Sequence, residues 1–267
     1  MGNGIVLGLV GSPNPKGKTN ELVTAALEGA ARSGARTELV QMSEHIVAAC
    51  KDCLPWVCRK NLKCTYEDPA FEFLSEKVLN CDALVLGSPV YWADTSAMVK
   101  YFTIKMLRTH GMAGSLRGLP ALGVAIAGGT GNGLVAGLRP LYHFFYVMAM
   151  RALEPLPATR FNFDSALQRA NELGAKLASM CGERQPLASI GEWTLWYDEL
   201  PYIGMDRAAE RRLLAGLTTA ALTDGSGPSL ASRLVAADVL ASQGRKLEAL
   251  DEVIDVYRTG LKLYDGR

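Results

Sequence analysis

The chain has almost no net charge, few histidines and no long apolar run. Its 267 residues carry a formal net charge of +1, which gives no electrostatic basis for binding nucleic acid. No run of about 18 apolar residues occurs, so we expect no association with a membrane. The amino terminus lacks a basic region, an apolar stretch and a small-residue cleavage site, and we therefore expect a cytoplasmic protein. The three histidines, His45, His110 and His143, do not fall at metal-ligand spacing.

Predicted strands and helices alternate along most of the chain. Such alternation predicts an α/β fold with a doubly wound, five-stranded parallel sheet, in which ligands bind at the carboxyl ends of the strands. The strands are expected at Ile5–Val10, Thr37–Met42, Ala83–Leu86, Ala121–Ala127 and Ala152–Pro155. The helices are expected at Asn20–Ser33, Pro69–Asn80, Thr95–Thr109, Leu134–Met150 and Ser165–Cys181.

The loop after the first strand is the most informative segment. Gly11 and Gly17 allow a sharp turn, and the N–H groups around Thr19 and Asn20 would then face outward at the positive end of the helix, where a phosphate binds well. A nucleotide triphosphate loop needs four residues between its glycines, whereas five separate these two. The loop therefore favours a single monophosphate, and a triphosphate and an ordinary capped turn are the alternatives.

Two further strand ends favour a ligand at the same edge of the sheet. The segment from Asp82 to Lys100 places Tyr91 and Trp92 at the carboxyl end of its strand, although these aromatic residues could also belong to the core. Residues 128–133, Gly-Gly-Thr-Gly-Asn-Gly, follow the next strand. This run has so few side chains that a flat ring could lie against its backbone, and a flexible turn is the alternative.

Together these motifs resemble a known family. Gly-Ser-Pro in the first loop, a cysteine cluster after the second strand, and Gly-Ser-Pro-Val-Tyr-Trp followed by Lys100 resemble the NAD(P)H-dependent FMN reductases of the flavodoxin-like fold, and among them the iron-sulfur flavoproteins. The similarity covers roughly Ile5 to Met180. It implies that FMN is the cofactor and that NAD(P)H is an electron donor. Because the flavin carries out the chemistry, no catalytic side chain is expected.

The resemblance also implies which residues contact FMN. The phosphate would lie on the first loop, at Ser12, Asn14, Lys18, Thr19 and Asn20. The isoalloxazine ring would lie over Pro89, Val90, Tyr91 and Trp92, with Gly128, Gly129, Thr130 and Gly131 at another edge. Many relatives have an arginine in the first loop where this chain has Asn14 or Pro15, so Lys16 or Lys18 would supply part of the positive charge.

Four of the six cysteines lie in one short loop, residues 50–64. Cys50, Cys53, Cys58 and Cys64 could surround a tetrahedral metal ion or an iron-sulfur cube. We expect a [4Fe-4S] cluster, because a cluster beside a flavin gives electrons a path from a two-electron carrier to a one-electron acceptor. Structural zinc and metal-free thiols stay open, since four sulfurs suit both metals. Nearby cations would offset the cluster's negative charge: Lys51, Arg59, Lys60 and Lys63.

The remainder of the chain has a different character. We expect a flavodoxin-like FMN-binding domain at 1–185 and a helical extension at 186–267. Helical patterns in the extension cover Met205–Leu222, Ser229–Ser242 and Lys246–Tyr264. The last of them carries an apolar stripe that requires a partner surface. This surface could be its own sheet or a dimer mate, or the extension could form a lid or docking platform over the flavin.

These features predict an FMN-dependent oxidoreductase that takes a hydride from NAD(P)H or an organic donor. Its electrons would pass to a small-molecule or protein acceptor, with a cluster in the cysteine loop as one route. The resemblance and the apolar helices predict a homodimer or homotetramer. Two alternatives stay open: a non-enzymatic electron carrier or redox sensor, and a binding module whose cysteine loop is held by zinc.

Overall fold

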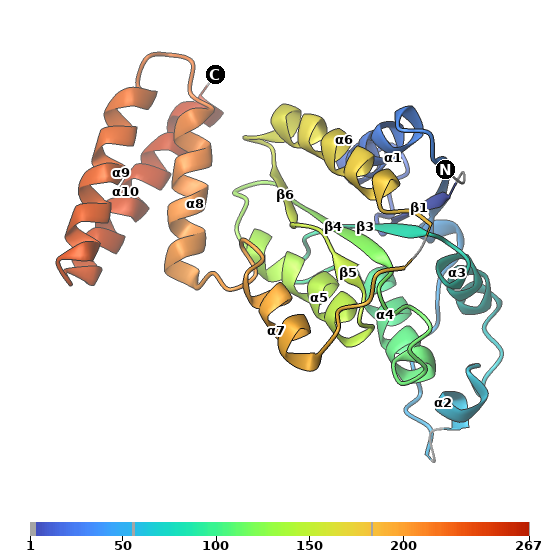
Figure 1. Ribbon diagram of the computed structural model, residues 1–267. Coiled ribbons are helices and arrows are strands. Elements are labelled where there is room, and N and C mark those ends of the chain that lie inside the picture. The colour runs from blue at the N-terminus through green and yellow to red at the C-terminus, as the bar shows by residue number, and fades with distance from the viewer. Residues whose placement is uncertain (1–3, 55–56, 183, 267) are drawn as a thin grey trace.

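The fold is a parallel sheet covered by helices on both faces (Figure 1), which confirms the predicted fold class. The structure is a computed structural model that describes residues 4–54, 57–182 and 184–266. The strands run in the order β2-β1-β3-β4-β5, and β6 also pairs with β4. They are β1 Ile5–Val10, β2 Arg36–Gln41, β3 Ala83–Pro89, β4 Pro120–Ala127, β5 Arg151–Ala152 and β6 Leu156–Thr159.

The predicted fifth strand, Ala152–Pro155, is wrong. Two short strands, β5 and β6, occupy this edge of the sheet, and both pair with β4. Pro155 lies between them. Because proline has no N–H group to donate to a neighbouring strand, it interrupts the ladder there.

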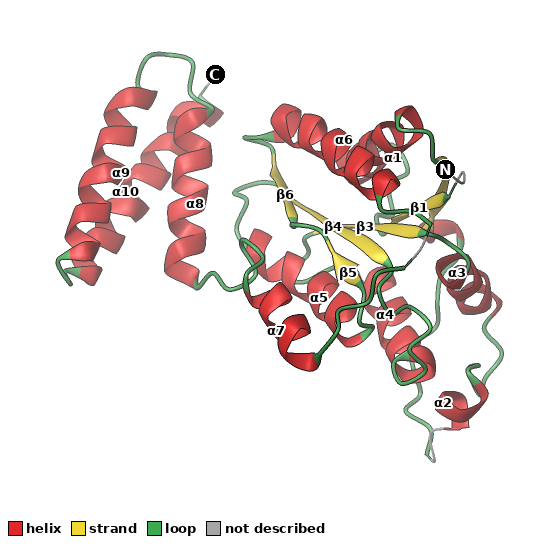
Figure 2. Ribbon diagram, in the orientation of Figure 1, coloured by secondary structure: helices red, strands yellow, loops and turns green. Residues whose placement is uncertain are grey.

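Helices cover the two faces of the sheet unequally (Figure 2). Two helices, α1 Lys18–Arg32 and α6 Phe163–Ser179, pack on one face. The other face is covered by α3 Pro69–Leu79, α4 Ala97–His110 and α5 Leu134–Val147. Every residue of β4 is buried, which explains why the central strands read as apolar runs without alternation.

The remaining helices pack in different places. They are α2 Val57–Asn61, α7 Ile190–Asp198, α8 Arg207–Ala220, α9 Gly227–Ser242 and α10 Lys246–Asp265, and a 3₁₀ turn, η1, spans Met42–Glu44. The Tyr197 side chain on α7 belongs to the core of the sheet, where its hydroxyl donates to the Met150 carbonyl at 3.0 Å. Helices α8, α9 and α10 surround a separate core that includes Leu214, Leu234 and Val256. The domain division at residue 185 stays a prediction.

Within the described ranges, no helix is both long enough and apolar enough to cross a membrane. The cysteine loop contains Pro55 and Trp56, which lie outside the described residues.

Candidate functional site

The three predicted ligand loops are neighbours at the carboxyl ends of β1, β3 and β4. The Gly11 N–H at the end of β1 donates to the Gly87 carbonyl at 2.8 Å, and the Val90 N–H after β3 donates to the Ile126 carbonyl at 2.9 Å. In the third loop, a Cβ atom added to Gly133 would lie only 2.9 Å from the Cα atom of Ala93. Segments far apart in the sequence therefore form one continuous edge.

The first loop presents the start of α1. The Ser12 hydroxyl accepts the Asn14 N–H at 3.2 Å, and the Gly17 N–H donates to the Asn14 carbonyl at 3.1 Å. Thr19 is buried, and its methyl group would lie 3.2 Å from a Cβ atom added to Gly87. Gly17 is the N-cap, and no side chain caps α1. An uncapped helix start that faces a turn is a favourable place for an anion.

The other predicted phosphate residues differ in placement. The Asn14 side chain is exposed, and the Lys18 ammonium lies 4.4 Å from the ring centre of Phe163 at the start of α6. The prediction of a free N–H at Asn20 is wrong, because this group donates to the Gly17 carbonyl at 2.9 Å. The Asn20 side-chain oxygen accepts the Thr24 hydroxyl at 3.2 Å. Phosphate contacts by these side chains stay predictions.

The second loop is a tight hairpin with an unusual backbone. Tyr91 and Asp94 exchange two backbone hydrogen bonds of 2.9 and 3.0 Å. Between them, Trp92 and Ala93 have φ values of +50° and +60°. A turn of this kind normally uses asparagine and glycine, and strained backbone of this kind clusters at functional sites. Trp92 is fully exposed and Tyr91 is 48% exposed, so neither is a core aromatic.

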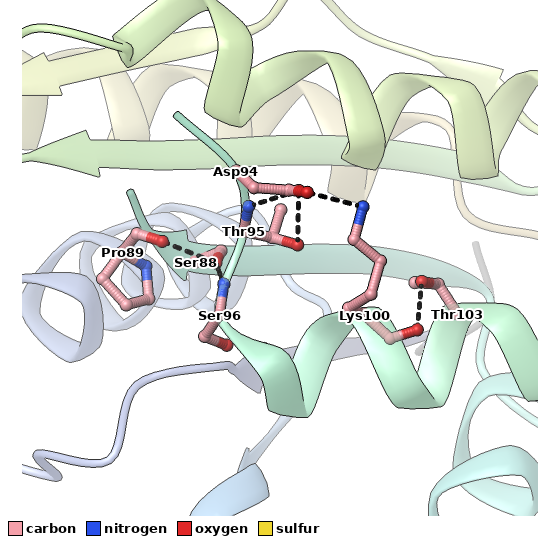
Figure 3. A network of polar contacts seen from close by, with 7 residues as sticks. All are labelled: Ser88, Pro89, Asp94, Thr95, Ser96, Lys100 and Thr103. Atoms are coloured by element: carbon pink, nitrogen blue, oxygen red, sulfur yellow. Dashed lines mark hydrogen bonds and ion pairs between the residues drawn. The ribbon is translucent and has the colours of Figure 1, made fainter. Parts of the chain in front are cut away.

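A polar network beside this hairpin joins the end of β3 to the start of α4 (Figure 3). The Ser88 hydroxyl accepts the Ser96 N–H at 3.0 Å, and the Ser96 side chain caps α4. The Asp94 carboxylate lies 2.9 Å from the Lys100 ammonium. The sequence reasoning missed Ser88, Asp94 and Ser96, although a serine before a helical pattern is a typical N-cap signal. The network holds the aromatic residues at the sheet edge.

The third loop exposes backbone rather than side chains. Gly128, Gly129 and Thr130 are exposed, and the Gly131 N–H donates to the Gly128 carbonyl at 2.9 Å. The φ values of Gly129, Gly131 and Gly133 are +53°, +79° and +82°. Glycine is the residue that adopts such angles without strain. The loop thus offers a backbone surface on which a flat ring could lie.

The four clustered cysteines line one cavity of about 130 Å³. Its wall also includes Lys51 from the loop and two cations from α4, Lys105 and Arg108. Sequence reasoning missed these two, although their helical spacing of three residues places both on one side of α4. Three other cations were predicted from the sequence to lie near the cluster. Arg59 and Lys60 are exposed on α2, and Lys63 pairs with Glu72 at 3.1 Å.

The donor set of this cavity suits iron-sulfur or zinc ligation, since four thiols line one space. Its wall carries charges of both signs, because Glu67 also lines it and Arg108 pairs with Asp52 at 2.6 Å. The four thiols are not arranged around a common point as metal ligands would be. Among the described residues, no three side chains of histidine, cysteine, aspartate or glutamate lie close enough together to hold a metal ion. The Cys53 sulfur instead lies 3.5 Å from the Thr65 hydroxyl, and the Cys58 sulfur lies 3.9 Å from the Arg108 carbonyl.

One buried carboxylate joins the two ends of the cysteine loop. Asp68 accepts the Ala48 N–H before the loop at 3.0 Å and the Phe71 N–H in the first turn of α3 at 3.1 Å. It also forms an ion pair with Lys105. Burial alone would raise the pKa of Asp68, but the hydrogen bonds from Lys105, Phe71 and Ala48 together hold this pKa below its ordinary value.

The cysteine cavity and the ligand edge lie at opposite ends of α4. The second loop leads into the helix at Ser96, whereas the cavity is lined by Lys105, Arg108 and Thr109. These residues lie nine to thirteen positions after Ser96, which corresponds to about 14–20 Å of helical rise. The position of a cluster relative to a flavin ring stays a prediction.

The two remaining cysteines are separate from the cavity. Cys81 is buried and Cys181 is partly buried. Burial raises the pKa of the Cys81 thiol to about 12 and that of Cys181 to about 11. Such thiols are poor ligands and poor nucleophiles, and these two pack as small apolar side chains in or against the two cores of the sheet.

Comparison with known proteins agrees with the geometry of the edge. The model of the NADPH-dependent FMN reductase family matches residues 5–160, which contain all three loops and the cysteines of residues 50–64. The chain is 28% identical over 189 residues to an iron-sulfur flavoprotein of Methanocaldococcus jannaschii, covering 66% of this chain and 96% of that protein. It is 29% identical over 180 residues to an iron-sulfur flavoprotein of Archaeoglobus fulgidus, covering 64% and 78%.

A solved structure shares the fold. An NAD(P)H:quinone oxidoreductase from Methanothermobacter marburgensis superposes with a TM-score of 0.52 at 19% identity, over 66% of this chain and 96% of that one. The family match covers more than half of the chain and includes the whole candidate site. The chain therefore belongs to the NADPH-dependent FMN reductase family.

Proposed function

We propose that this FMN-dependent oxidoreductase accepts a hydride from NAD(P)H and passes the electrons to a small-molecule or protein acceptor. One observation carries the proposal: three loops from separate strands meet at one sheet edge, with an uncapped helix start at one side and an exposed aromatic hairpin at the other. These are the two surfaces that a phosphate and a flat ring require.

The first loop would hold the phosphate of FMN. The hydroxyls of Ser12 and Thr19 flank the turn, and the start of α1 lies between them. Lys16 or Lys18 would supply positive charge in place of an arginine. This donor set fits a single phosphate, because it combines neutral hydroxyls, helix N–H groups and cations.

The second and third loops would hold the ring. When bound, FMN supplies the hydride-accepting ring and can release electrons singly or in pairs. The residues of the chain orient it: Tyr91 and Trp92 offer aromatic surface, while Gly128 and Gly129 leave room beside the backbone. The hairpin is closed by two backbone hydrogen bonds between Tyr91 and Asp94, and the Asp94 carboxylate pairs with Lys100, so part of the ordering cost would not fall on cofactor binding.

We also propose that the cysteine loop holds a [4Fe-4S] cluster. Two similar archaeal proteins are iron-sulfur flavoproteins, and the four cysteines of this chain line one cavity with Lys51, Lys105 and Arg108. Lys51 would offset part of the charge of a thiolate-bound cluster, whereas Lys105 and Arg108 already pair with Asp68 and Asp52. The cluster would supply one-electron transfer. We further propose that the protein is cytoplasmic and forms a homodimer or homotetramer.

The test is anaerobic purification with flavin, iron, acid-labile sulfide and zinc measured on the same sample. We expect FMN together with equal amounts of iron and sulfide, and oxidation of NAD(P)H when a quinone is added. If no flavin is present and added FMN is not taken up, the proposed function is wrong. Zinc in place of iron would refute the proposed cluster but not the proposed FMN site. Bound FMN without NAD(P)H oxidation would favour a non-enzymatic electron carrier.

A matched pair of variants separates the cluster from the fold. Cys64→Ser should lose iron and retain FMN, because Cys64 lines the cavity at the far end of α4 from the ligand edge. Cys81→Ser should retain both, since Cys81 lies outside the cavity.

A further inference from the structure

The C-terminal helices contact the glycine loop that the family resemblance assigns to the flavin. Figure 1 shows the bundle of α8, α9 and α10 beside the sheet domain, on the side of β6 and α5. The Tyr257 hydroxyl on α10 donates to the Thr130 carbonyl. The Arg211 guanidinium on α8 donates to the side-chain oxygen of Asn132 at 2.7 Å. Both contacts reach residues 128–133 from more than 75 positions away in the sequence.

Two further residues of α8 contact the glycine loop and the start of α5. A Cβ atom added to Gly131 would lie 2.9 Å from a methyl carbon of Leu214, so the loop backbone packs directly on this side chain. The Glu210 carboxylate accepts the Val135 N–H at 3.2 Å and so satisfies a donor at the start of α5. Side chains of the bundle therefore hold the loop and the first turn of the helix that follows it.

The contacts from α8 and α10 are also joined to each other. The Arg211 guanidinium carbon lies 5.0 Å from the centre of the Tyr257 ring, within the range of a cation–π interaction. Burial raises the pKa of Tyr257 above its ordinary value and outweighs the contact with Thr130 and the positive charge of Arg211 and Arg160, which lower it.

A loop of this composition requires such support. Three of its glycines have positive φ, and glycine loses more conformational freedom on ordering than any other residue. A loop that is already ordered binds its ligand more tightly, because the entropy cost does not fall on the binding step.

We propose that α8 and α10 brace residues 128–133 in the conformation that receives the flavin ring, with Tyr257 and Arg211 as positioning residues for the cofactor. The inference rests on the proposed FMN site. The family match ends at residue 160, so the brace lies outside the part of the chain shared with the family model.

The test compares neighbouring arginines on the same helix. Arg211→Met removes the contact with the loop, whereas Arg212→Met removes an ion pair with Asp238 at 2.8 Å inside the bundle. Tyr257→Phe removes only the hydroxyl. For each variant we would measure hydrogen exchange at residues 128–135 in the flavin-free protein, the FMN dissociation constant, the visible circular dichroism of bound FMN, and the melting temperature.

We expect faster exchange in residues 128–135, a dissociation constant raised about 3- to 10-fold and an altered flavin dichroism in Arg211→Met and Tyr257→Phe, as the loss of a hydrogen bond predicts. Arg212→Met should change neither the exchange, the dissociation constant nor the dichroism. Its melting temperature should be similar to those of the two loop variants. If the wild type binds FMN and the two loop variants match Arg212→Met in exchange and affinity, the inference is wrong. If the wild type itself binds no FMN, the proposed function fails and the inference fails with it.

Discussion

Lys105 and Asp68 form an ion pair inside the protein, where each side chain is only 5% exposed. Because the same carboxylate accepts N–H groups from both ends of the cysteine loop, the pair fixes the loop to α4. Removing one partner of such a pair leaves an uncompensated buried charge, which is far more costly than losing an exposed ion pair.

Lys105→Met should lower the free energy of unfolding by about 3–5 kcal/mol. Urea denaturation of the metal-free protein would measure it. The control is Lys100→Met on the same helix, which breaks the partly exposed pair with Asp94 and should cost less than about 1 kcal/mol. Similar losses in the two variants would mean that burial of the Lys105 pair contributes little.

The exposed aromatic hairpin gives a second prediction. Trp92 is fully exposed, so Trp92→Ala should change the free energy of unfolding by no more than about 0.5 kcal/mol. If its ring contacts the flavin, the FMN dissociation constant should rise about 3- to 10-fold, as expected for the loss of an aromatic stacking contact. Equilibrium titration that follows flavin fluorescence would show this. Unchanged affinity would exclude a contact between Trp92 and the ring.

The buried thiols predict a loss of stability in alkaline solution. Burial raises the pKa of Cys81 to about 12, whereas an unfolded thiol has a pKa of about 9. Since the unfolded chain releases this proton first, the contribution of Cys81 is complete below pH 9 and is lost as the pH rises toward 12. Cys81→Ala should begin less stable, because of the cavity it leaves, but should lose stability less steeply between pH 9 and 11. Denaturation curves across this range would measure the slope, and equal slopes would contradict the assigned pKa.

Much of the fold could be predicted from the sequence because the physical signals were local. A buried parallel strand is an apolar run, as in Ile5–Val10, and a glycine turn before a helical pattern indicates a ligand loop. The split of the last strand at Pro155 was missed, since a short apolar run does not show where its partner strand ends.

The missed parts of the site depend on contacts between distant segments. Lys105 and Arg108 come from a helix some forty positions after the cysteine loop. Arg211 and Tyr257 reach the glycine loop from a separate group of helices. Periodicity could show that the last helix needed a partner surface, but it could not show which surface, because packing between distant segments leaves no local pattern.

The first loop gives a prediction that distinguishes contacts with the phosphate of FMN from contacts with its ring. Thr19 is buried beside the uncapped start of α1, and Thr19→Val replaces its hydroxyl by a methyl group of similar size. If this hydroxyl donates to the phosphate, the FMN dissociation constant should rise about 10-fold or more, as expected for a hydrogen bond to a charged group. Riboflavin, which has no phosphate, should bind the variant and the wild type equally. Thr103→Val is the control, because the buried Thr103 hydroxyl donates to the Lys100 carbonyl within α4, away from the first loop. An equal loss of riboflavin binding would show that Thr19 supports the loop and does not contact the phosphate.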